Sequence, residues 1–273
     1  MAPLLTHREA AQLETARVAG ATELELSLDL ERNRQRIELR SPHWRWQQHD
    51  WPYPGRLKER TVYAPEGDGW APLARFDGAL IKLVPTDWGP PTFEIDGIKM
   101  LVSAQRSPLD DARAKVALVR PRGARVLDCC GGLGYFTLCL LEAGAATIRS
   151  FEKNSTVLWL RSLNPWSPSP DARLLLTPGD VANEIAGLAD RSFDAVLHDP
   201  PRFGIAGELY SREFYEHLAR VLVPGGRLFH YTGAPNRITS GRDVPGEVLK
   251  RLTAGGFDAQ RTADGVLAVR GRT

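Results

Sequence analysis

The chain has 273 residues, of which 42% are hydrophobic, so it can bury a core in one large domain or in two unequal ones. Its 35 basic and 33 acidic residues give a net charge of +2, which excludes an overall field that would draw the protein to nucleic acid or to an anionic membrane. The sequence shows no signal peptide and no apolar run long enough to span a membrane, and its three cysteines lack the spacing of a zinc site. We therefore expect a cytoplasmic protein that uses no metal and inserts into no membrane.

The first 105 residues are expected to form a smaller, mainly β domain. Apolar residues at helical spacing predict a short amphipathic helix over 4–20. Polar and apolar residues alternate strictly over 22–30 and again over 36–40, which predicts a β-hairpin with one buried face. Further strands are expected over 78–84 and 92–101.

Residues 42–55 have the most unusual composition in the chain, with three tryptophans among prolines and histidines. Aromatic side chains interleaved with cations can stack on single-stranded nucleic acid. Because Arg45 and Arg56 are the cations of this stretch, we favour an irregular connection whose rings pack on the fold or close over a pocket as a wall or lid.

From residue 106 to residue 273 the pattern changes to alternating strands and helices. Ser107 is placed to cap a helix over 108–120, with Pro108 in its first turn. Strands are then expected over 125–129, 147–152, 173–177, 193–198 and 226–232, helices over 134–143, 154–162, 181–188, 211–222 and 245–254, and a closing pair near 256–262 and 265–270. This alternation predicts an α/β domain of Rossmann-like type, with a mainly parallel sheet and helices on both faces.

The stretch 124–137, A-R-V-L-D-C-C-G-G-L-G-Y-F-T, predicts a strand, a tight glycine turn and a helix. A ligand over such a turn meets bare backbone and the N–H groups of a helix N-terminus, which suits a nucleotide-like molecule. The next strand ends at Glu152, where a carboxylate can accept hydrogen bonds from both ribose hydroxyls of an adenosine.

Together with F-E-K-N at 151–154, P-G-D-V at 178–181, H-D-P-P-R at 198–202 and V-P-G-G at 223–226, the glycine motif resembles the ordered motifs of class I S-adenosylmethionine-dependent methyltransferases. More narrowly, L-N-P-W-S, H-D-P-P-R-F-G, A-G-E-L-Y-S and H-Y-T-G are similar to predicted archaeal-type methyltransferases. Cys130 departs from the family pattern, because it stands where the first glycine is usual.

The resemblance implies that S-adenosylmethionine is the cofactor. It implies a hydrogen bond from the adenine amino group to Asp180 and a contact of the ring with Val181. The residues expected to bind the cofactor are Asp128, Cys130, Gly132, Gly134, Tyr135, Glu152, Lys153, Asp180, Val181, Asp199 and Pro200.

Three residues are expected to act in catalysis. Asp199 is placed to orient or deprotonate an acceptor, because the two prolines after it fix the loop. Arg202 stands where enzymes that methylate planar nitrogens usually have an aromatic residue, so it either holds an anionic group of the acceptor or forms a surface ion pair. Tyr231 either offers its ring to the sulfonium or fills the wall, whereas His198 is expected to be a buried core histidine.

These residues favour methyl transfer to a small-molecule acceptor, either anionic or an amine. An alternative keeps the cofactor but breaks another C–S bond and releases methylthioadenosine, as in aminopropyl transfer or in a cyclisation like that of azetidine-2-carboxylate synthases. Methylation of RNA is a second, less favoured alternative. A cysteine nucleophile is not expected, because the segment around Asp199 contains no cysteine.

Overall fold

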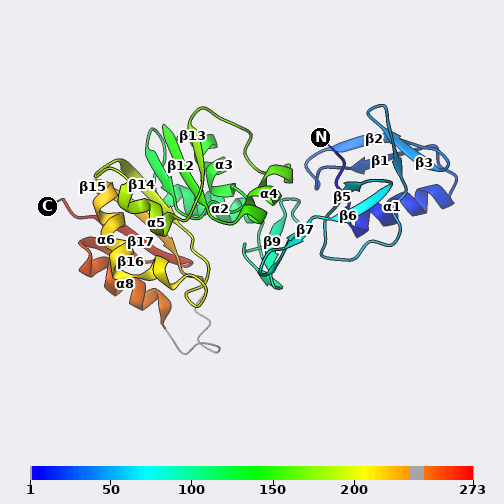
Figure 1. Cartoon of the computed structure of the whole chain (residues 1–273). Coiled ribbons are helices and arrows are strands. Elements are labelled where there is room, and N and C mark those ends of the chain that lie inside the picture. The colour runs from blue at the N-terminus through cyan, green and yellow to red at the C-terminus, as the bar shows by residue number, and fades with distance from the viewer. Residues whose placement is uncertain (1, 234–242, 273) are drawn as a thin grey trace. The chain divides into compact units, whose positions relative to one another are not determined.

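The structure is a computed structural model that describes residues 2–233 and 243–272. The chain divides into two compact units. The first unit contains Met1–Asp110 and Trp159–Trp166, and the second contains Asp111–Leu158 and Ser167–Thr273. Figure 1 shows the elements of both units along the chain.

The first unit is built from α1, short antiparallel strands and the ends of two helices that continue in the second unit. Two four-stranded sheets have the orders β1-β2-β3-β4 and β10-β9-β8-β7, and β5 and β6 form a ribbon. The elements are α1 (His7–Val18), β1 (Glu23–Ser27), β2 (Arg34–Leu39), β3 (His43–Trp46), β4 (His49–Pro52), β5 (Tyr63–Glu66), β6 (Gly69–Pro72), β7 (Ala74–Phe76), β8 (Leu80–Val84), β9 (Thr92–Ile95) and β10 (Ile98–Lys99). The predicted helix and the predicted hairpin of β1 and β2 are therefore confirmed.

The tryptophan-rich stretch forms the hairpin of β3 and β4, so the prediction of an irregular connection is wrong. Trp44 and Trp51 face each other across the two strands, and such aromatic cross-strand pairs stabilise a hairpin. Trp44 is fully buried, stacks on Trp70 with ring centroids 6.3 Å apart, and donates its indole N–H to the carbonyl of Pro52. This ring is part of the core of the first unit.

The segment Trp159–Trp166 belongs to the first unit through specific contacts. The indole N–H of Trp166 donates to the carbonyl of Leu30 at 2.9 Å. The guanidinium of Arg75 lies 3.8 Å from the centre of the Trp159 ring. A stretch that is distant in sequence thus completes the packing of the N-terminal residues.

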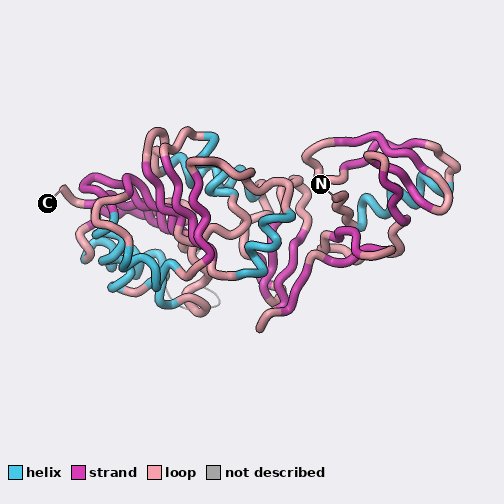
Figure 2. Tube along the Cα trace, turned by 45° about the horizontal axis from the view of Figure 1, so that its top comes forward, coloured by secondary structure: helices cyan, strands magenta, loops and turns pink. Residues whose placement is uncertain are grey.

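The second unit is a seven-stranded sheet of order β13-β12-β11-β14-β15-β17-β16, with helices on both sides of the strands (Figure 2). Strands β11 to β15 are parallel, and β17 runs antiparallel to both β15 and β16. Its elements are α2 (Pro108–Leu118, which begins in the first unit), β11 (Arg125–Asp128), α3 (Tyr135–Glu142), β12 (Thr147–Glu152), α4 (Ser155–Leu163, which ends in the first unit), β13 (Leu174–Pro178), α5 (Val181–Glu184), η1 (Ile185–Gly187), β14 (Phe193–His198), η2 (Gly207–Tyr210), α6 (Arg212–Val221), β15 (Leu222–Tyr231), α8 (Val244–Ala254), β16 (Phe257–Arg261) and β17 (Gly265–Arg270). The predicted Rossmann-like α/β fold is confirmed.

The strand order places the functional edge of this sheet. The chain moves outward from β11 through β12 to β13, and then returns to the other side of β11 as β14. Ligands of open α/β sheets bind at the carboxyl ends of the strands where the order reverses. In this sheet that point lies between the ends of β11 and β14, which are Asp128 and His198.

No helix among the described residues is long and apolar enough to cross a membrane.

Candidate active site

The glycine turn connects β11 to α3. Gly132 and Gly134 have φ angles of 50° and 86°, a left-handed conformation that residues with a Cβ rarely adopt. Gly134 is the N-cap of α3, and no side chain caps this helix end. The turn therefore offers backbone N–H groups of a helix N-terminus to a ligand. Tyr135, the first residue of α3, is buried.

Asp128 anchors the turn from inside the fold. Its side chain is fully buried, and its Oδ2 accepts hydrogen bonds from the hydroxyls of Ser150 at 2.8 Å and Thr137 at 3.3 Å. A buried carboxylate is costly unless donors surround it, so these hydroxyls fix its position. Burial of this kind favours a role in shaping the turn. Cys130 is half-buried, and burial raises the pKa of its thiol well above the usual value, which keeps it protonated.

Glu152 lies at the end of β12, opposite the glycine turn. Its Oε2 accepts from the backbone N–H of Gly132 at 2.9 Å, and its Oε1 accepts from that of Asn154 at 2.9 Å. A carboxylate can accept about four hydrogen bonds, so these two backbone bonds are compatible with additional contacts to ribose hydroxyls. The carboxylate is thus held in a fixed direction beside the turn.

Asp180, Lys153 and Val181 lie around the end of β13. Asp180 is the N-cap of α5, where its Oδ1 accepts from the N–H of Ala182 at 3.0 Å. Its Oδ2 is 3.1 Å from the half-exposed ammonium of Lys153, which also lies 3.6 Å from Glu208. Val181 is 3% exposed and belongs to the core of the second unit. Asp180 therefore caps a helix and carries an ion pair at the edge where an adenine is predicted.

Asp199 directly follows β14 and is the central ionisable group of this edge. Its side chain is 19% exposed, and the adjacent Pro200 is buried. Burial raises the pKa of Asp199 to about 6, the negative charges of Asp111 and Asp128 add to this, and Lys115 opposes it. Such a carboxylate is largely ionised at pH 7 and is still basic enough to take a proton.

Lys115 is the site residue that the sequence did not reveal. It lies on α2 and is 3% exposed, which is rare for a lysine. Its Nζ is 2.7 Å from Oδ2 of Asp111, 3.8 Å from Oδ2 of Asp199 and 3.6 Å from the centre of the Tyr231 ring. Asp111 and Lys115 are four residues apart on one helix, a spacing that indicates an ion pair but not its burial at the catalytic edge.

The Tyr231 ring therefore already meets a cation of the protein. The ammonium of Lys115 lies over one face of this ring, where a cation is attracted by the π electrons. Tyr231 ends β15 and is half-buried, whereas the neighbouring His230 is fully buried. Of these two residues, Tyr231 is the one at the site.

Two buried histidines directly precede Asp199 and Tyr231 in the sequence. His198 is fully buried, as predicted, and its ring lies 4.4 Å from the ring of His230. Burial lowers both pKa values, that of His198 to about 4, so both rings are neutral. Nε2 of His198 then donates to the carbonyl of Leu209 at 3.0 Å, and Nδ1 of His230 donates to that of Tyr231 at 2.9 Å.

This protonation state leaves Nε2 of His230 as an acceptor, and it receives the hydroxyl of Tyr215 at 2.9 Å. The two rings therefore tie the ends of β14 and β15 to η2 and α6. They position the residues that follow them rather than exchange protons, because neither ring carries a charge near neutral pH.

Arg202 lies on the exposed loop after Pro201. Its guanidinium makes no hydrogen bond or ion pair within the described part of the chain. Phe203 follows it and packs edge-on against the Tyr210 ring, with centroids 5.5 Å apart. The Tyr210 hydroxyl donates to the carbonyl of Pro201 at 3.0 Å. Tyr210 thus fixes the loop that carries Asp199.

These residues fit an S-adenosyl cofactor. The left-handed glycine turn presents backbone without side chains, and Glu152 presents a fixed carboxylate beside it. Asp111, Asp199 and Lys115 together carry an excess of one negative charge, which suits a positively charged sulfonium. Among residues 2–233 and 243–272 there is no group of three or more His, Cys, Asp or Glu side chains placed to hold a metal ion.

No protein-family profile matches the chain. A curated protein of Methanocaldococcus jannaschii, uncharacterized protein MJ1233, is 43% identical over 196 residues, and the match covers 70% of this chain and 67% of that protein. The chain belongs to the family of MJ1233. A shorter match to polyamine aminopropyltransferase 2 of Streptomyces coelicolor is 38% identical over 65 residues, or 23% of this chain and 12% of that protein.

Solved structures with the same fold include two spermidine synthases. One, in complex with the transition state analogue AdoDATO, has a TM-score of 0.59 at 16% identity, over 73% of each chain. The other, from Thermotoga maritima, has a TM-score of 0.57 at 15% identity, over 73% of this chain and 72% of that one. At such identities the likeness shows that this member of the MJ1233 family shares their class I methyltransferase-like fold.

Proposed function

We propose that the protein binds S-adenosylmethionine at the glycine turn and transfers the methyl group to a small amine, with Asp199 as the group that takes up the proton. The observation that carries this proposal is the carboxylate of Asp199, largely buried at the point where the strand order reverses. Its pKa of about 6 lets it accept a proton near neutral pH. The fold supports the proposal, since a spermidine synthase with this fold binds the transition state analogue AdoDATO.

When bound, S-adenosylmethionine supplies a methyl carbon attached to a positively charged sulfur. Methyl transfer would break the S–C bond with its electron pair left on sulfur and form the N–C bond, and the resulting ammonium would lose one proton. The Asp199 carboxylate accepts that proton and passes it to solvent. The negative excess of the cluster of Asp199, Asp111 and Lys115 favours a cationic donor and a basic acceptor over an anionic acceptor.

Aminopropyl transfer is the second candidate, because the 65-residue match to polyamine aminopropyltransferase 2 favours it. The same adenosine contacts would serve, and the same carboxylate would take the proton from an amine. The two reactions differ in which bond to sulfur breaks, so the released thioether separates them. A cyclisation of the cofactor would release methylthioadenosine without any acceptor.

The test is to incubate the full chain with S-adenosylmethionine, or with its decarboxylated form, in the presence and absence of a panel of amines. Mass spectrometry then identifies the thioether. We expect S-adenosylhomocysteine, formed only with S-adenosylmethionine and an amine. Asp199→Asn should abolish its release and leave cofactor affinity within about threefold, a small free-energy change for a group outside the adenosine contacts. Asp258→Asn, an exposed carboxylate on β16, is the matched control.

Methylthioadenosine formed from the decarboxylated form and an amine would replace methyl transfer by aminopropyl transfer, and methylthioadenosine formed without an acceptor would indicate cyclisation. If calorimetry detects no binding of S-adenosylmethionine or S-adenosylhomocysteine, the cofactor assignment itself is wrong.

A further inference from the structure

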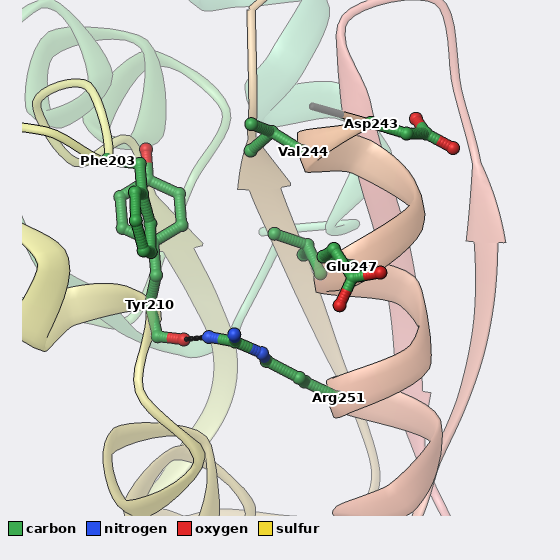
Figure 3. A pocket seen from close by; sticks show the side chains of 7 residues that line it. Phe203, Tyr210, Asp243, Val244, Glu247 and Arg251 are labelled. Carbon is green, nitrogen blue, oxygen red and sulfur yellow. Dashed lines mark hydrogen bonds between the residues drawn. The ribbon is translucent and has the colours of Figure 1, made fainter. Parts of the chain in front are cut away.

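A cavity of about 360 Å³ lies next to the loop that carries Asp199. One wall is formed by the rings of Phe203 and Tyr210, and the other by the first turns of α8 (Figure 3). The lining residues are Phe203, Tyr210, Asp243, Val244, Glu247, Val248 and Arg251. This volume is within the range of about 300–1,000 Å³ that is usual for small-molecule sites.

The aromatic wall is joined to the catalytic loop by direct contacts. The Tyr210 hydroxyl donates to the carbonyl of Pro201, two residues after Asp199. Burial raises the pKa of Tyr210, and the negative charge of Asp199 adds to this. On the other side, the guanidinium of Arg251 donates to the backbone carbonyl of Tyr210 (Figure 3). One wall of the cavity is therefore fixed to the loop that carries Asp199.

The side chains that line the cavity carry an excess of one formal negative charge. Two carboxylates and one guanidinium line the cavity, and the guanidinium of Arg251 is engaged with a backbone carbonyl. Asp243 is an N-cap and pairs with Arg261. The ion pair of Glu247 is weaker, because its oxygen lies 3.3 Å from the ammonium of Lys250 and both side chains are more than half exposed. Arg202, a cation of the same loop as Phe203, is not among the lining residues.

The remaining surface of the cavity is apolar. Val244 and Val248 face the two aromatic rings, and a side-chain pair of this kind encloses a hydrocarbon chain or a flat ring. The carboxylate of a ligand in this cavity would be repelled by the carboxylates of Glu247 and Asp243. A ligand that carries only an amine would not be repelled by them.

We infer that this cavity is the acceptor site and that the acceptor is an amine with an apolar body and no carboxylate. This inference rests on the proposed transfer to an amine and adds the class of that amine. The apolar body lies between the Phe203–Tyr210 wall and the valines of α8, and the amine lies toward Glu247. Glu247 discriminates against amino acids.

Binding to the full chain without added cofactor tests this directly. The probes are phenethylamine and phenylalanine, which differ only by the carboxylate, and the measurement is ligand-observed NMR or calorimetry. We expect phenethylamine to bind at least tenfold more tightly than phenylalanine. Equal affinity of the two probes, or tighter binding of phenylalanine, would overturn the inference.

Two variants locate the site. Val244→Phe should fill the cavity and weaken phenethylamine binding at least tenfold, with the affinity for S-adenosylhomocysteine unchanged within twofold. Glu247→Gln should weaken phenethylamine and strengthen phenylalanine, so that their ratio falls several-fold. Glu216→Gln is the matched control, because Glu216 forms an exposed ion pair with Arg212 on α6 and lies outside the cavity. A general disturbance of the fold would weaken both probes alike, so it would not change the ratio of the phenethylamine and phenylalanine affinities.

The failures of the two proposals are distinguishable. If the enzyme releases a thioether with an amine but Val244→Phe leaves the KM of that amine unchanged, the acceptor site lies elsewhere and the proposed function stands. If Arg202→Ala, rather than Glu247→Gln, changes the ratio of the two probes, the acceptor is anionic and held by the exposed loop. If S-adenosylhomocysteine does not bind to the unaltered protein, the proposed function fails whatever the cavity binds.

Discussion

Lys115 and Asp111 should shift the pH dependence of the reaction in opposite directions. The active form of Asp199 is the carboxylate, so kcat/KM rises as the pH increases through the pKa of this group. Removal of the lysine charge in Lys115→Met takes away an opposite charge and raises that pKa above about 6, which moves the acid limb to higher pH. Asp111→Asn removes a like charge, lowers the pKa and moves the limb to lower pH.

The size of the shift follows from the distance between the charges. At the 3.8 Å between Nζ of Lys115 and Oδ2 of Asp199, an effective dielectric constant of about 20 gives an attraction of roughly 4 kcal/mol. That energy corresponds to about 3 pKa units at most. Because Asp199 is partly exposed and Asp111 shares the lysine, we expect the limb to move by about 1–2 units in Lys115→Met.

The assay is the pH profile of kcat/KM from thioether release, for the unaltered protein and for Lys115→Met, Asp111→Asn and Lys115→Arg. The arginine variant keeps the charge and should leave the limb near its original position. If the two charge-removing variants lower the rate equally at every pH without moving the midpoint, Lys115 only supports the fold. Shifts in the same direction would refute the electrostatic reasoning.

Three further outcomes are expected. Glu152→Ala should weaken the binding of S-adenosylhomocysteine at least tenfold in calorimetry, because hydrogen bonds to a charged group contribute about 1.5–3 kcal/mol each; unchanged affinity would remove Glu152 from the adenosine site. Tyr210→Phe should lower kcat several-fold with little change in cofactor affinity, because it frees the carbonyl of Pro201; an unchanged kcat would show that the loop does not depend on this bond. His198 is neutral in the folded protein with a pKa of about 4, so the unfolded chain binds more protons below pH 6.5 and stability falls from there toward pH 4. This loss amounts to at most about 3 kcal/mol, and thermal melts of His198→Gln should show a shallower fall of Tm over the same range; an identical slope would contradict the assignment.

The parts of the fold that follow from local pattern could be predicted. Apolar strands alternate with amphipathic helices after residue 106, and the glycine turn marks the first strand of the sheet, so the elements of the second unit agree with prediction to within a few residues at most ends. The hairpin of β3 and β4 could not be predicted, because prolines and histidines hide the alternation of its two strands. Its stability comes from cross-strand pairing and from the stack of Trp44 on Trp70, which lies in a later ribbon.

The full extent of the first unit also could not be predicted from local composition. A change in composition near residue 105 indicated a boundary, and the fold puts it between Asp110 and Asp111. The addition of Trp159–Trp166 depends on the bond from Trp166 to Leu30 and on the stacking of Arg75 over Trp159. Both interactions join residues far apart in sequence, and no periodicity of the chain reports them.

In the candidate site, too, some residues could be placed from the local sequence and others only from contacts distant in sequence. The positions of Asp128, Glu152, Asp180 and Asp199 follow from the rule that parallel strands bring their carboxyl ends to one edge, because each residue lies at or directly after a strand end or in the turn that follows. Lys115 lies on a helix that precedes the first strand of the sheet, and a helix can turn any of its faces toward that edge. Its i,i+4 spacing from Asp111 is equally typical of a solvent-exposed pair, which contributes little to stability. The packing of α2 alone determines that this pair is buried near Asp199. Burial lets the two charges shift the pKa of Asp199 strongly, because the same charges in water would interact with it several times more weakly.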